Sequence, residues 1–258
     1  MAHIAENTHY YDRSGKPVYQ VPNASKPGEL RDTRLNDARK MGLVPGTTEI
    51  LKGQDRPGLT SWLIEQHILA TMTLPRLEGE LDADFIRRVK VDAQEHGKQA
   101  AEKGTLIHAA IQGHFEGVPP SEEYLPYVQG AVAELERACG AQEWHCETSF
   151  SHRDGYGGKA DLHSADWLVD VKGKDFGPDD KLVTYDEHHQ QLSAYQRGLG
   201  MYQSLAGILF VSRNNPGLAR FVQVSGDELS RGLAMFDALL ALWKAKKKFD
   251  PSFNKGVA

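Results

Sequence analysis

The chain has 258 residues, of which 40% are hydrophobic and 25% are charged, and its formal net charge is −5. This composition is ordinary for a globular protein and excludes a largely disordered or collagen-like chain. The length suffices for one large domain with a substantial core. The overall charge gives no sign of nucleic-acid binding, so such a surface has to be local. Lys172, Lys174 and Lys181 form one local cluster, and the lysines at 244–248 form another that we interpret as a solvated face.

The cysteine count and the hydropathy indicate the cellular compartment. Cys139 and Cys146 are too few for a disulfide framework, and one chain with two thiolates cannot hold an iron–sulfur cluster. The longest purely apolar stretches, such as residues 238–243, are far shorter than the ~20 residues that cross a bilayer. The first six residues lack the basic and apolar segments of a secretory signal. We therefore expect a reduced, cytoplasmic protein without a membrane partner.

The first half of the chain is predicted to be helical. Residues 1–45 are polar and weakly periodic, which indicates an N-terminal arm on the core, with a short exposed helix over residues 29–41. The remainder, residues 46–258, is expected to form one domain. Its first helices are predicted over residues 59–71, 82–100, 101–116 and 122–138. The residues spaced as one face of the first of these helices are Trp62, Leu63, His67 and Ile68.

At residue 144 the hydrophobic period shifts from 3.6 residues to about 2. Strands are predicted over residues 144–150, 157–163, 167–172, 207–212 and 220–224. A helix over residues 184–200, opened by a capping box of Thr184 and Glu187, separates the third strand from the fourth. A second capping box, Ser225 with Glu228, opens a last helix that runs to about residue 248. This order predicts an α/β fold in which helices flank a mixed central sheet, with an N-terminal helical region.

Two acidic residues are expected to face each other on the second and third predicted strands. If these strands form a hairpin with residues 165–166 at its tip, Asp161 lies directly opposite Asp170. Carboxylates this close repel each other unless a cation lies between them or one is protonated, and a divalent metal fits there. Lys172 shares a face with Asp170 because side chains alternate along a strand. A slip of one residue in register would abolish the arrangement.

Two acids and a lysine around a metal suit the hydrolysis of a phosphodiester bond. The metal polarises the phosphoryl oxygen and helps to generate hydroxide, while the lysine orients or deprotonates the attacking water and offsets negative charge. The alternative is a surface hairpin with alternating charges. On the following helix His188, Gln191 and Tyr195 share one face, where Gln191 and Tyr195 are spaced to reach a phosphate or a bound water. Tyr195 is equally compatible with a place in the core.

Four motifs in order resemble the PD-(D/E)XK nuclease superfamily, in the branch that contains the RecB nuclease domain and lambda-type exonucleases. They are Gly-Thr-Leu-Ile-His at 104–108, Gly-Lys-Ala-Asp at 158–161, Asp-Val-Lys at 170–172 and Gln-Leu-Ser-Ala-Tyr at 191–195. A lone DxK is weak evidence, whereas four motifs in this order are specific. The resemblance covers about residues 46–213 and implies a restriction-endonuclease-like core. The proline of the superfamily's name is absent, as is common in this branch.

The resemblance also implies a role for each matching residue. The implied ligands of Mg²⁺ or Mn²⁺, with one or two ions per site, are His108, Asp161, Asp170, the backbone carbonyl of Val171 and, as a further candidate, Glu147. The implied catalytic residues are Asp161, Asp170, Lys172 and Gln191. Gln191 and Tyr195 are implied to serve the active-site water and the DNA backbone. Besides Tyr195, we expect Lys174 and His188 to contact DNA. CRISPR-associated relatives carry an iron–sulfur cluster on four cysteines, which this chain lacks.

The sequence therefore predicts a metal-dependent deoxyribonuclease, with an exonuclease of phage recombination or DNA repair as the preferred interpretation. If the chain is phage-encoded, it would act in the bacterial cytoplasm. DNA is the expected partner, and a single-strand-annealing or other recombination protein and a second copy of the chain are further candidates. A structure-specific endonuclease, a non-catalytic nucleic-acid-binding protein on the same scaffold and a hydrolase of small phosphoesters remain alternatives. The GxxxxGK[ST] loop of ATPases is missing.

Overall fold

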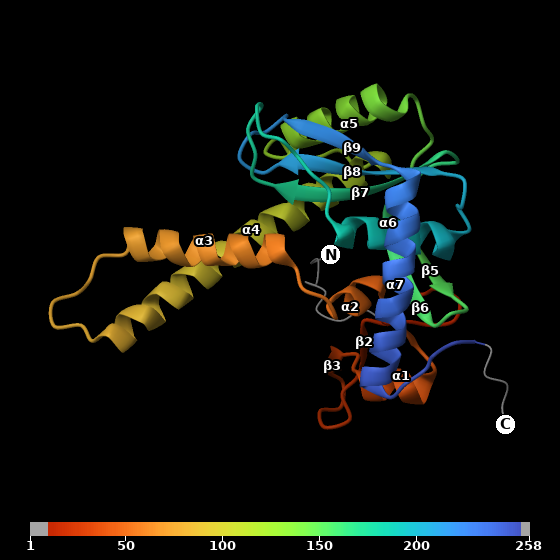
Figure 1. Ribbon diagram of the computed structural model, residues 1–258, viewed down its shortest axis with the longest axis horizontal. Coiled ribbons are helices and arrows are strands. Elements are labelled where there is room, and N and C mark those ends of the chain that lie inside the picture. Colours follow the sequence, from red (N-terminus) through yellow and green to blue (C-terminus); the bar gives the residue numbers. More distant parts are fainter. Residues whose placement is uncertain (1–9, 254–258) are drawn as a thin grey trace.

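A five-stranded mixed sheet with helices on both faces forms the centre of the molecule (Figure 1). The computed structural model describes residues 10–253; residues 1–9, in which no secretory signal is expected, and residues 254–258 lie outside the described part. The strands, in their order across the sheet, are β5 (His145–His152), β6 (Tyr156–His163), β7 (Trp167–Lys174), β8 (Leu205–Ser212) and β9 (Ala219–Val224). This architecture confirms the predicted α/β fold.

The connections between the strands follow the predicted order. Strands β5, β6 and β7 form an antiparallel meander, β8 is parallel to β7, and β9 returns antiparallel to β8. The parallel pair requires a crossover, which α6 (Asp186–Leu199) provides. The hairpin of β6 and β7 has the predicted register, since Leu162 lies opposite Val169 and His163 opposite Leu168. The backbone ladder between these strands ends with those two pairs, one position before the acidic residues.

Two buried apolar clusters lie on opposite faces of the sheet. Helices α6 and α7 (Gly226–Lys247) cover the face that carries Leu168 and Phe210. Helices α4 (Asp82–Phe115) and α5 (Leu125–Cys139) cover the face that carries Val169 and Leu209. Because both faces are covered, β8 is apolar along almost its whole length. Alternation along β7 places Asp170 on the same face as Leu168, toward α6.

The capping box predicted for the last helix is confirmed, whereas the one predicted for α6 is wrong. Ser225 is the N-cap of α7, and its backbone N–H donates to Oε2 of Glu228 at 2.9 Å. Helix α6 has Tyr185 as its N-cap, one residue later than expected. The backbone N–H of Tyr185 donates to Nδ1 of His188 at 3.2 Å, so His188 takes the place predicted for Glu187. The Thr184 hydroxyl lies instead 2.8 Å from Nε2 of the next histidine in the helix.

Residues 82–115 form one continuous helix, so the prediction of two helices over 82–100 and 101–116 is wrong. No breaker separates the two predicted segments, because Ala100 and Ala101 are the strongest helix formers. Gly104 does not end the helix either. It lies against β7, where a Cβ added to Gly173 would be 3.2 Å from the Cα of Gly104. The missing side chain of Gly173 therefore lets α4 approach the sheet closely, whereas a Cβ on Gly104 would meet no neighbouring atom within 4 Å.

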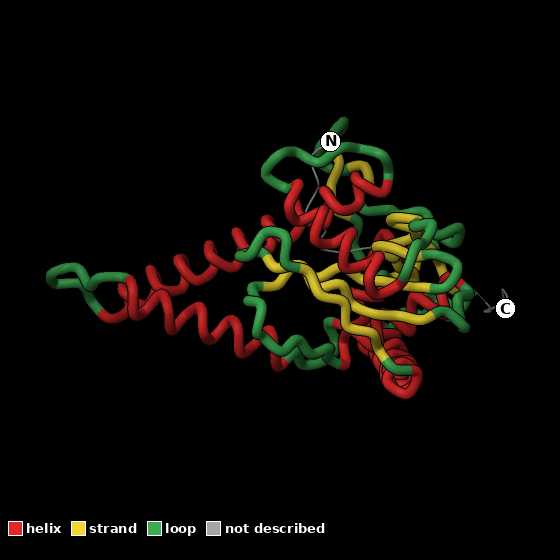
Figure 2. The backbone as a smooth tube through the Cα atoms, turned by 90° about the horizontal axis from the view of Figure 1, so that it is seen from above, coloured by secondary structure: helices red, strands yellow, loops and turns green. Residues whose placement is uncertain are grey.

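Helix α3 (Pro57–Thr73) and the first half of α4 project from the body as a two-helix hairpin (Figures 1 and 2). Ala70, Phe85 and Val89 form a small cluster between the two helices. The predicted apolar face of α3 is divided, since Trp62 packs toward Gly97 of α4 while Ile68 is largely exposed. Among the helices of residues 10–253, none has the length and apolarity that a bilayer span requires.

The described part of the N-terminal arm packs on the sheet. Its elements, with the helix that follows, are β1 (Tyr10–Tyr11), β2 (Gln20–Pro22), β3 (Leu30–Asp32), α1 (Leu35–Met41), β4 (Val44–Pro45) and α2 (Thr47–Leu51). Strand β1 pairs with β4, and β2 pairs with β3. Tyr10 and Val44 are buried, and the Thr47 hydroxyl donates to the carbonyl of Gly157 at 2.9 Å. The helix expected over residues 29–41 is present in its second half only.

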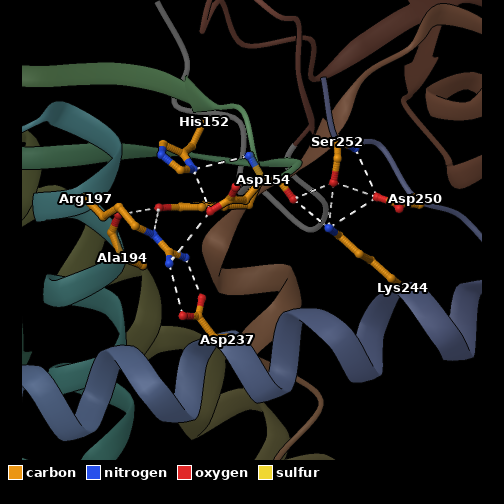
Figure 3. Close-up of polar contacts among 9 residues, drawn as sticks. His152, Asp154, Ala194, Arg197, Asp237, Lys244, Asp250 and Ser252 are labelled. Atoms are coloured by element: carbon orange, nitrogen blue, oxygen red, sulfur yellow. Dashed lines mark hydrogen bonds and ion pairs between the residues drawn. The ribbon is translucent and has the colours of Figure 1, made fainter. Parts of the chain in front are cut away.

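A polar network at the far end of α6 fixes this helix and the last described residues to the turn between β5 and β6 (Figure 3). Arg197 of α6 donates to both carboxylate oxygens of Asp237 on α7, at 2.7 and 3.1 Å. Lys244 of α7 donates to the backbone carbonyl of Asp154 at 2.7 Å and to the Ser252 hydroxyl at 2.8 Å. The position of α6 over the sheet is therefore held by α7 and by the turn together.

Loss of the cap of α7 should destabilise the protein measurably. Ser225→Ala removes the side chain that accepts a hydrogen bond from the Glu228 backbone N–H, so we expect the free energy of unfolding to fall by about 1 kcal/mol. The matched control is Ser230→Ala, an exposed position within the same helix, which should be neutral or slightly stabilising because alanine is the better helix former. Urea denaturation of both variants, with equal slopes, measures the difference. Equal stabilities would show that the cap contributes nothing.

Candidate active site

Three acidic residues lie at neighbouring positions on three adjacent strands. The residues before and after Glu147 in β5 pair with the residues after and before Asp161 in β6, so these two acids lie side by side. The register of the β6–β7 hairpin places Asp161 beside Asp170 in β7. The backbone ladder is interrupted at both positions. The backbone N–H of Val171 donates instead to Oδ2 of Asp161 at 2.8 Å. The predicted opposition of Asp161 and Asp170 is thus present in register, but the strands do not pair there.

Glu147 adopts an unusual backbone conformation at the first interruption. Its φ angle is 53°, in the left-handed region that residues with a side chain rarely occupy. This conformation costs roughly 1–2 kcal/mol for an L-amino acid other than glycine. Strain of this size persists only where the surrounding structure imposes it, and it is concentrated at functional sites. The strained residue is one of the three acids.

His108 of α4 joins two of these acids. Its Nε2 atom lies 3.2 Å from Oδ2 of Asp161 and 3.9 Å from Oε1 of Glu147. One ligand atom from each of the three residues lies within 4.8 Å of the others, as a metal site requires. The close approach of α4 at Gly104 brings His108, one turn further along the helix, over the strands. The predicted ligands His108, Glu147 and Asp161 are therefore brought together.

The other predicted residues form a connected chain beside this cluster. Asp170 is only 2% exposed. Its Oδ2 atom lies 2.8 Å from Nζ of Lys172, and its Oδ1 atom accepts a hydrogen bond from Nε2 of Gln191 at 2.8 Å. The same Gln191 amide donates to the Tyr195 hydroxyl at 3.2 Å. Asp170 is thus held by an ammonium on one side and by an amide on the other.

Burial and proximity set the charges in the site. Burial disfavours the charged form of His108, but Asp161 and Glu147 outweigh it and raise the pKa of the imidazole to about 9. Burial likewise disfavours the charge of Asp161, but the neighbouring His108 lowers its pKa to about 2. For Asp170, burial and the charge of Asp161 exceed the effect of Lys172 and raise the pKa to about 6. The two aspartates therefore differ in acidity because only Asp161 lies against an imidazolium.

The cluster lines a cleft of about 420 Å³ between α4, β6, β7 and the start of α2. Three cationic side chains, Lys159, Lys172 and Arg213, are among its lining residues. Lys159 forms an ion pair with Glu147. Arg213 donates to the carbonyl of Ala100 in α4 at 3.1 Å and so ties this helix to the end of β8. The cleft combines an acidic floor with basic side chains at its wall.

Tyr195 and His188, two of the predicted DNA contacts, lie within the fold. Tyr195 is buried, and its ring packs edge-on against Phe150 with 5.6 Å between the ring centroids. This is the core position that the sequence left open. His188 is also buried and lines a neighbouring hollow together with Lys172. Burial first, and then the charge of Lys172, lower the pKa of His188 to about 3, so the ring is neutral.

Lys174 and Val171 lie on β7 at either side of Lys172 and Gly173. Lys174 is the last residue of the strand, and its carbonyl accepts a hydrogen bond from the backbone N–H of Arg213 at 3.0 Å. It is partly exposed two positions beyond Lys172, on the same side of the strand. Val171 is buried and contacts Asp161 through its N–H group.

Sequence reasoning missed two cationic residues of the site and the reason for one glycine. Lys159 carried a signal, because it alternates with Asp161 on β6. Arg213 carried none, because its contact with Ala100 joins residues more than a hundred positions apart in the chain. The motif glycine Gly158 is required by packing, since a Cβ there would lie 2.6 Å from the Tyr195 ring and 2.8 Å from that of Phe150. The glycine of the motif therefore seats α6 on β6.

Comparisons with known proteins give structural neighbours only. No protein-family model matches the sequence, and the search of curated proteins finds no match. The structure is similar to that of a "putative exonuclease" from Eubacterium rectale, with 15% sequence identity and a TM-score of 0.43 over 57% of this chain and 68% of that chain. It is also similar to the structure of SSO0001, with 12% identity and a TM-score of 0.32 over 73% of this chain and 92% of that chain. The function is therefore argued from the site itself.

The strained backbone of Glu147 should reverse the usual preference for alanine over glycine. Glu147→Gly and Glu147→Ala both remove the carboxylate and its ion pair with Lys159, so they differ only in the backbone. At a φ of 53°, we expect the glycine variant to be the more stable of the two by about 1 kcal/mol. The free energies of unfolding of the two variants measure this.

Ser149, two residues further along β5, is the matched control, because it pairs regularly with Lys159. There glycine should be less stable than alanine by about 0.5–1 kcal/mol, as in the interior of an ordinary strand. The same order of stabilities at both positions would contradict the left-handed conformation of Glu147.

Proposed function

We propose that this protein is a nuclease that hydrolyses phosphodiester bonds in DNA with the help of a divalent metal ion. The observation that carries the proposal is the convergence of His108, Glu147 and Asp161 beside the pair of Asp170 and Lys172. These residues come from α4 and from three adjacent strands, and they line one cleft. An imidazole, three carboxylates and a lysine in one cleft suit phosphodiester hydrolysis better than they suit a purely structural role.

The donor set fits a divalent cation such as Mg²⁺ or Mn²⁺. Carboxylate oxygens are the ligands that these ions prefer, and one imidazole is compatible with Mn²⁺. Burial and the charge of Asp161 raise the pKa of Asp170, although the Lys172 ammonium lies 2.8 Å from its Oδ2 atom. One ammonium therefore does not balance the neighbouring acids, and a divalent cation would offset the remaining repulsion. When bound, a divalent ion would neutralise charge on the phosphate and make a water molecule more acidic.

Lys172 is suited to stabilise charge in this reaction. Its ammonium lies at the cleft, 2.8 Å from Asp170. Burial alone would lower the pKa of Lys172, but Asp170 and Asp161 outweigh burial and raise it. The side chain is therefore protonated at neutral pH. We infer that it orients the attacking water and offsets the negative charge that develops on the phosphate, and that it does not act as the base.

Gln191 and Tyr195 act on the site through Asp170. Both N–H groups of the Gln191 amide are used, one toward Asp170 and one toward the Tyr195 hydroxyl. This arrangement fixes the carboxylate of Asp170 at the edge of the cleft, which Gln191 and Tyr195 also line. We therefore propose that Gln191 is a positioning residue and that Tyr195 holds Gln191 in place. Contact with DNA falls to the basic residues at the cleft wall.

The substrate follows from the charge of the cleft wall. Lys159, Lys172 and Arg213 line the cleft, each paired with a carboxylate of the protein, Arg213 with Asp175. We propose that the anionic backbone of a nucleic acid approaches these cations, since phosphate contacts come mainly from lysine and arginine. Together with the order of the four sequence motifs, this supports a DNA exonuclease of phage recombination or DNA repair as the more specific proposal. A structure-specific endonuclease is the alternative, and the form of DNA that is cleaved distinguishes the two.

Cleavage should depend on a divalent ion and on Asp161. We expect linear duplex DNA to be degraded with Mg²⁺ or Mn²⁺ and to survive in excess EDTA, because the acids cannot bind the phosphate unaided. Asp161→Asn should reduce the rate by at least ~100-fold, in line with the loss of one electrostatic group, and leave DNA affinity largely intact. Asp166→Asn is the control, since this exposed aspartate lies at the tip of the same hairpin.

Parallel reactions on circular DNA decide the mode of cleavage. An exonuclease leaves a closed circle intact, whereas an endonuclease nicks or linearises it. Full activity in EDTA, or normal cleavage by Asp161→Asn, would contradict the proposed function altogether.

Lys172 should matter far more than Lys174, although both lie on β7 and point to the same side. Lys172→Ala is expected to lower the single-turnover rate by at least ~100-fold while Mn²⁺ affinity is kept, because it removes a stabilising charge and no ligand. Lys174→Ala should change the rate only a few-fold and act mainly on DNA affinity, most strongly at low salt. Single-turnover rates and affinities on one linear duplex separate the two effects. Equal losses in both variants would remove Lys172 from the catalytic set.

A further inference from the structure

Helix α3 has apolar side chains on every side, interspersed with mostly uncharged polar ones, yet it projects from the body of the molecule (Figures 1 and 2). Its 17 residues carry one charged side chain, Glu65, and no lysine or arginine. The helix packs mainly on α4, which covers one of its sides. A helix that is apolar all around is normally buried. The side of α3 that faces away from α4 is therefore expected to be covered by another molecule.

The outward side of α3 carries a regular apolar ridge. Ile64, Ile68 and Met72 follow one another at intervals of four residues and are 55%, 53% and 77% exposed. Together with His67 and Thr71 they line a shallow hollow of about 400 Å³. Residues four apart lie one above the other on a helix, so the three side chains form one continuous ridge. Nothing in the body of the protein reaches this ridge among the described residues.

We propose that two copies of the chain associate through this ridge, α3 against α3 around a two-fold axis. A ridge of residues four apart fits the groove of an identical helix, and an isologous contact of this kind closes as a dimer. The ridge itself carries no charge, so two copies meet without like-charge repulsion. A nucleic acid would require basic side chains, and an interfacial membrane helix is typically rich in them on its polar face, whereas α3 has none.

The dimensions of the hairpin suit a small dimer interface. At 1.5 Å per residue α3 is roughly 25 Å long, and one helix is roughly 10 Å wide, so its outward side presents on the order of 250 Å². Further exposed apolar side chains lie in the connecting loop and at the start of α4, namely Leu77, Leu81 and Ile86. A stable interface buries about 800 Å² on each partner. We therefore expect a dimer that dissociates on dilution.

Sedimentation velocity over a wide range of concentrations tests the proposal. The full chain should shift from monomer to dimer as its concentration rises. Ile68→Glu should remain monomeric throughout, because it brings two carboxylates together at the two-fold axis. The matched control is Leu242→Glu, on an exposed position of α7 that is 41% accessible, and it should dimerise like the unaltered chain. Far-ultraviolet circular dichroism establishes that both variants are folded.

Crosslinking provides an independent measurement. Ile68→Cys should form an intermolecular disulfide on mild oxidation, whereas Leu242→Cys and the unaltered chain, with its own Cys139 and Cys146, should not. A chain that stays monomeric at all concentrations, or an Ile68→Glu variant that dimerises normally, would overturn the proposal. Binding of the monomer through this face to phosphatidylcholine vesicles or to single-stranded DNA would also overturn it. Since α3 is remote in sequence from the catalytic motifs, these outcomes do not depend on nuclease activity.

Discussion

The interruption of two backbone ladders at neighbouring positions is the constraint on which the site depends. In a regular antiparallel sheet Glu147, Asp161 and Asp170 would lie in a row about 5 Å apart, within continuous backbone ladders. Here the left-handed backbone of Glu147 breaks the first ladder, and the bond from Val171 to the Asp161 carboxylate replaces the second. The sheet opens at the one place where three negative charges would otherwise crowd together. The space that results is the floor of the cleft.

One glycine affects how far α4 contributes to that opening. Gly173 has no side chain where the backbone of Gly104 passes, so the helix lies close to β7 and His108 reaches Asp161. The imidazolium then compensates part of the acidic charge and accounts for the low pKa of Asp161. Arg213 fastens the helix from the other side through the carbonyl of Ala100. The charge balance of the site is thus a consequence of the backbone approach.

The opposite side of the site is built into the apolar core. Tyr195 is packed against Phe150 and holds Gln191, which in turn holds Asp170. Gly158 makes room for this packing, and the network around Arg197 fixes the far end of the same helix (Figure 3). The motif residues Gln191 and Tyr195 therefore hold the carboxylate of Asp170 in a fixed orientation. A carboxylate held by buried partners keeps its orientation when a charged substrate or ion arrives.

The order of the five sheet strands and of α6 and α7, the register of the β6–β7 hairpin and the acidic residues around Asp161 could all be predicted from the sequence alone. The hydrophobic period and the turn residues act locally, so the strands and helices that they favour can be predicted from the sequence. Only the tertiary structure decided that residues 82–115 form one helix, that Glu147 is strained and that Tyr195 lies in the core. Contacts between distant segments also determine how close His108 lies to two strands, how Arg213 ties α4 to the end of β8 and how exposed α3 is. Such contacts are set by packing and by backbone approach, for which no single stretch of sequence carries a signal.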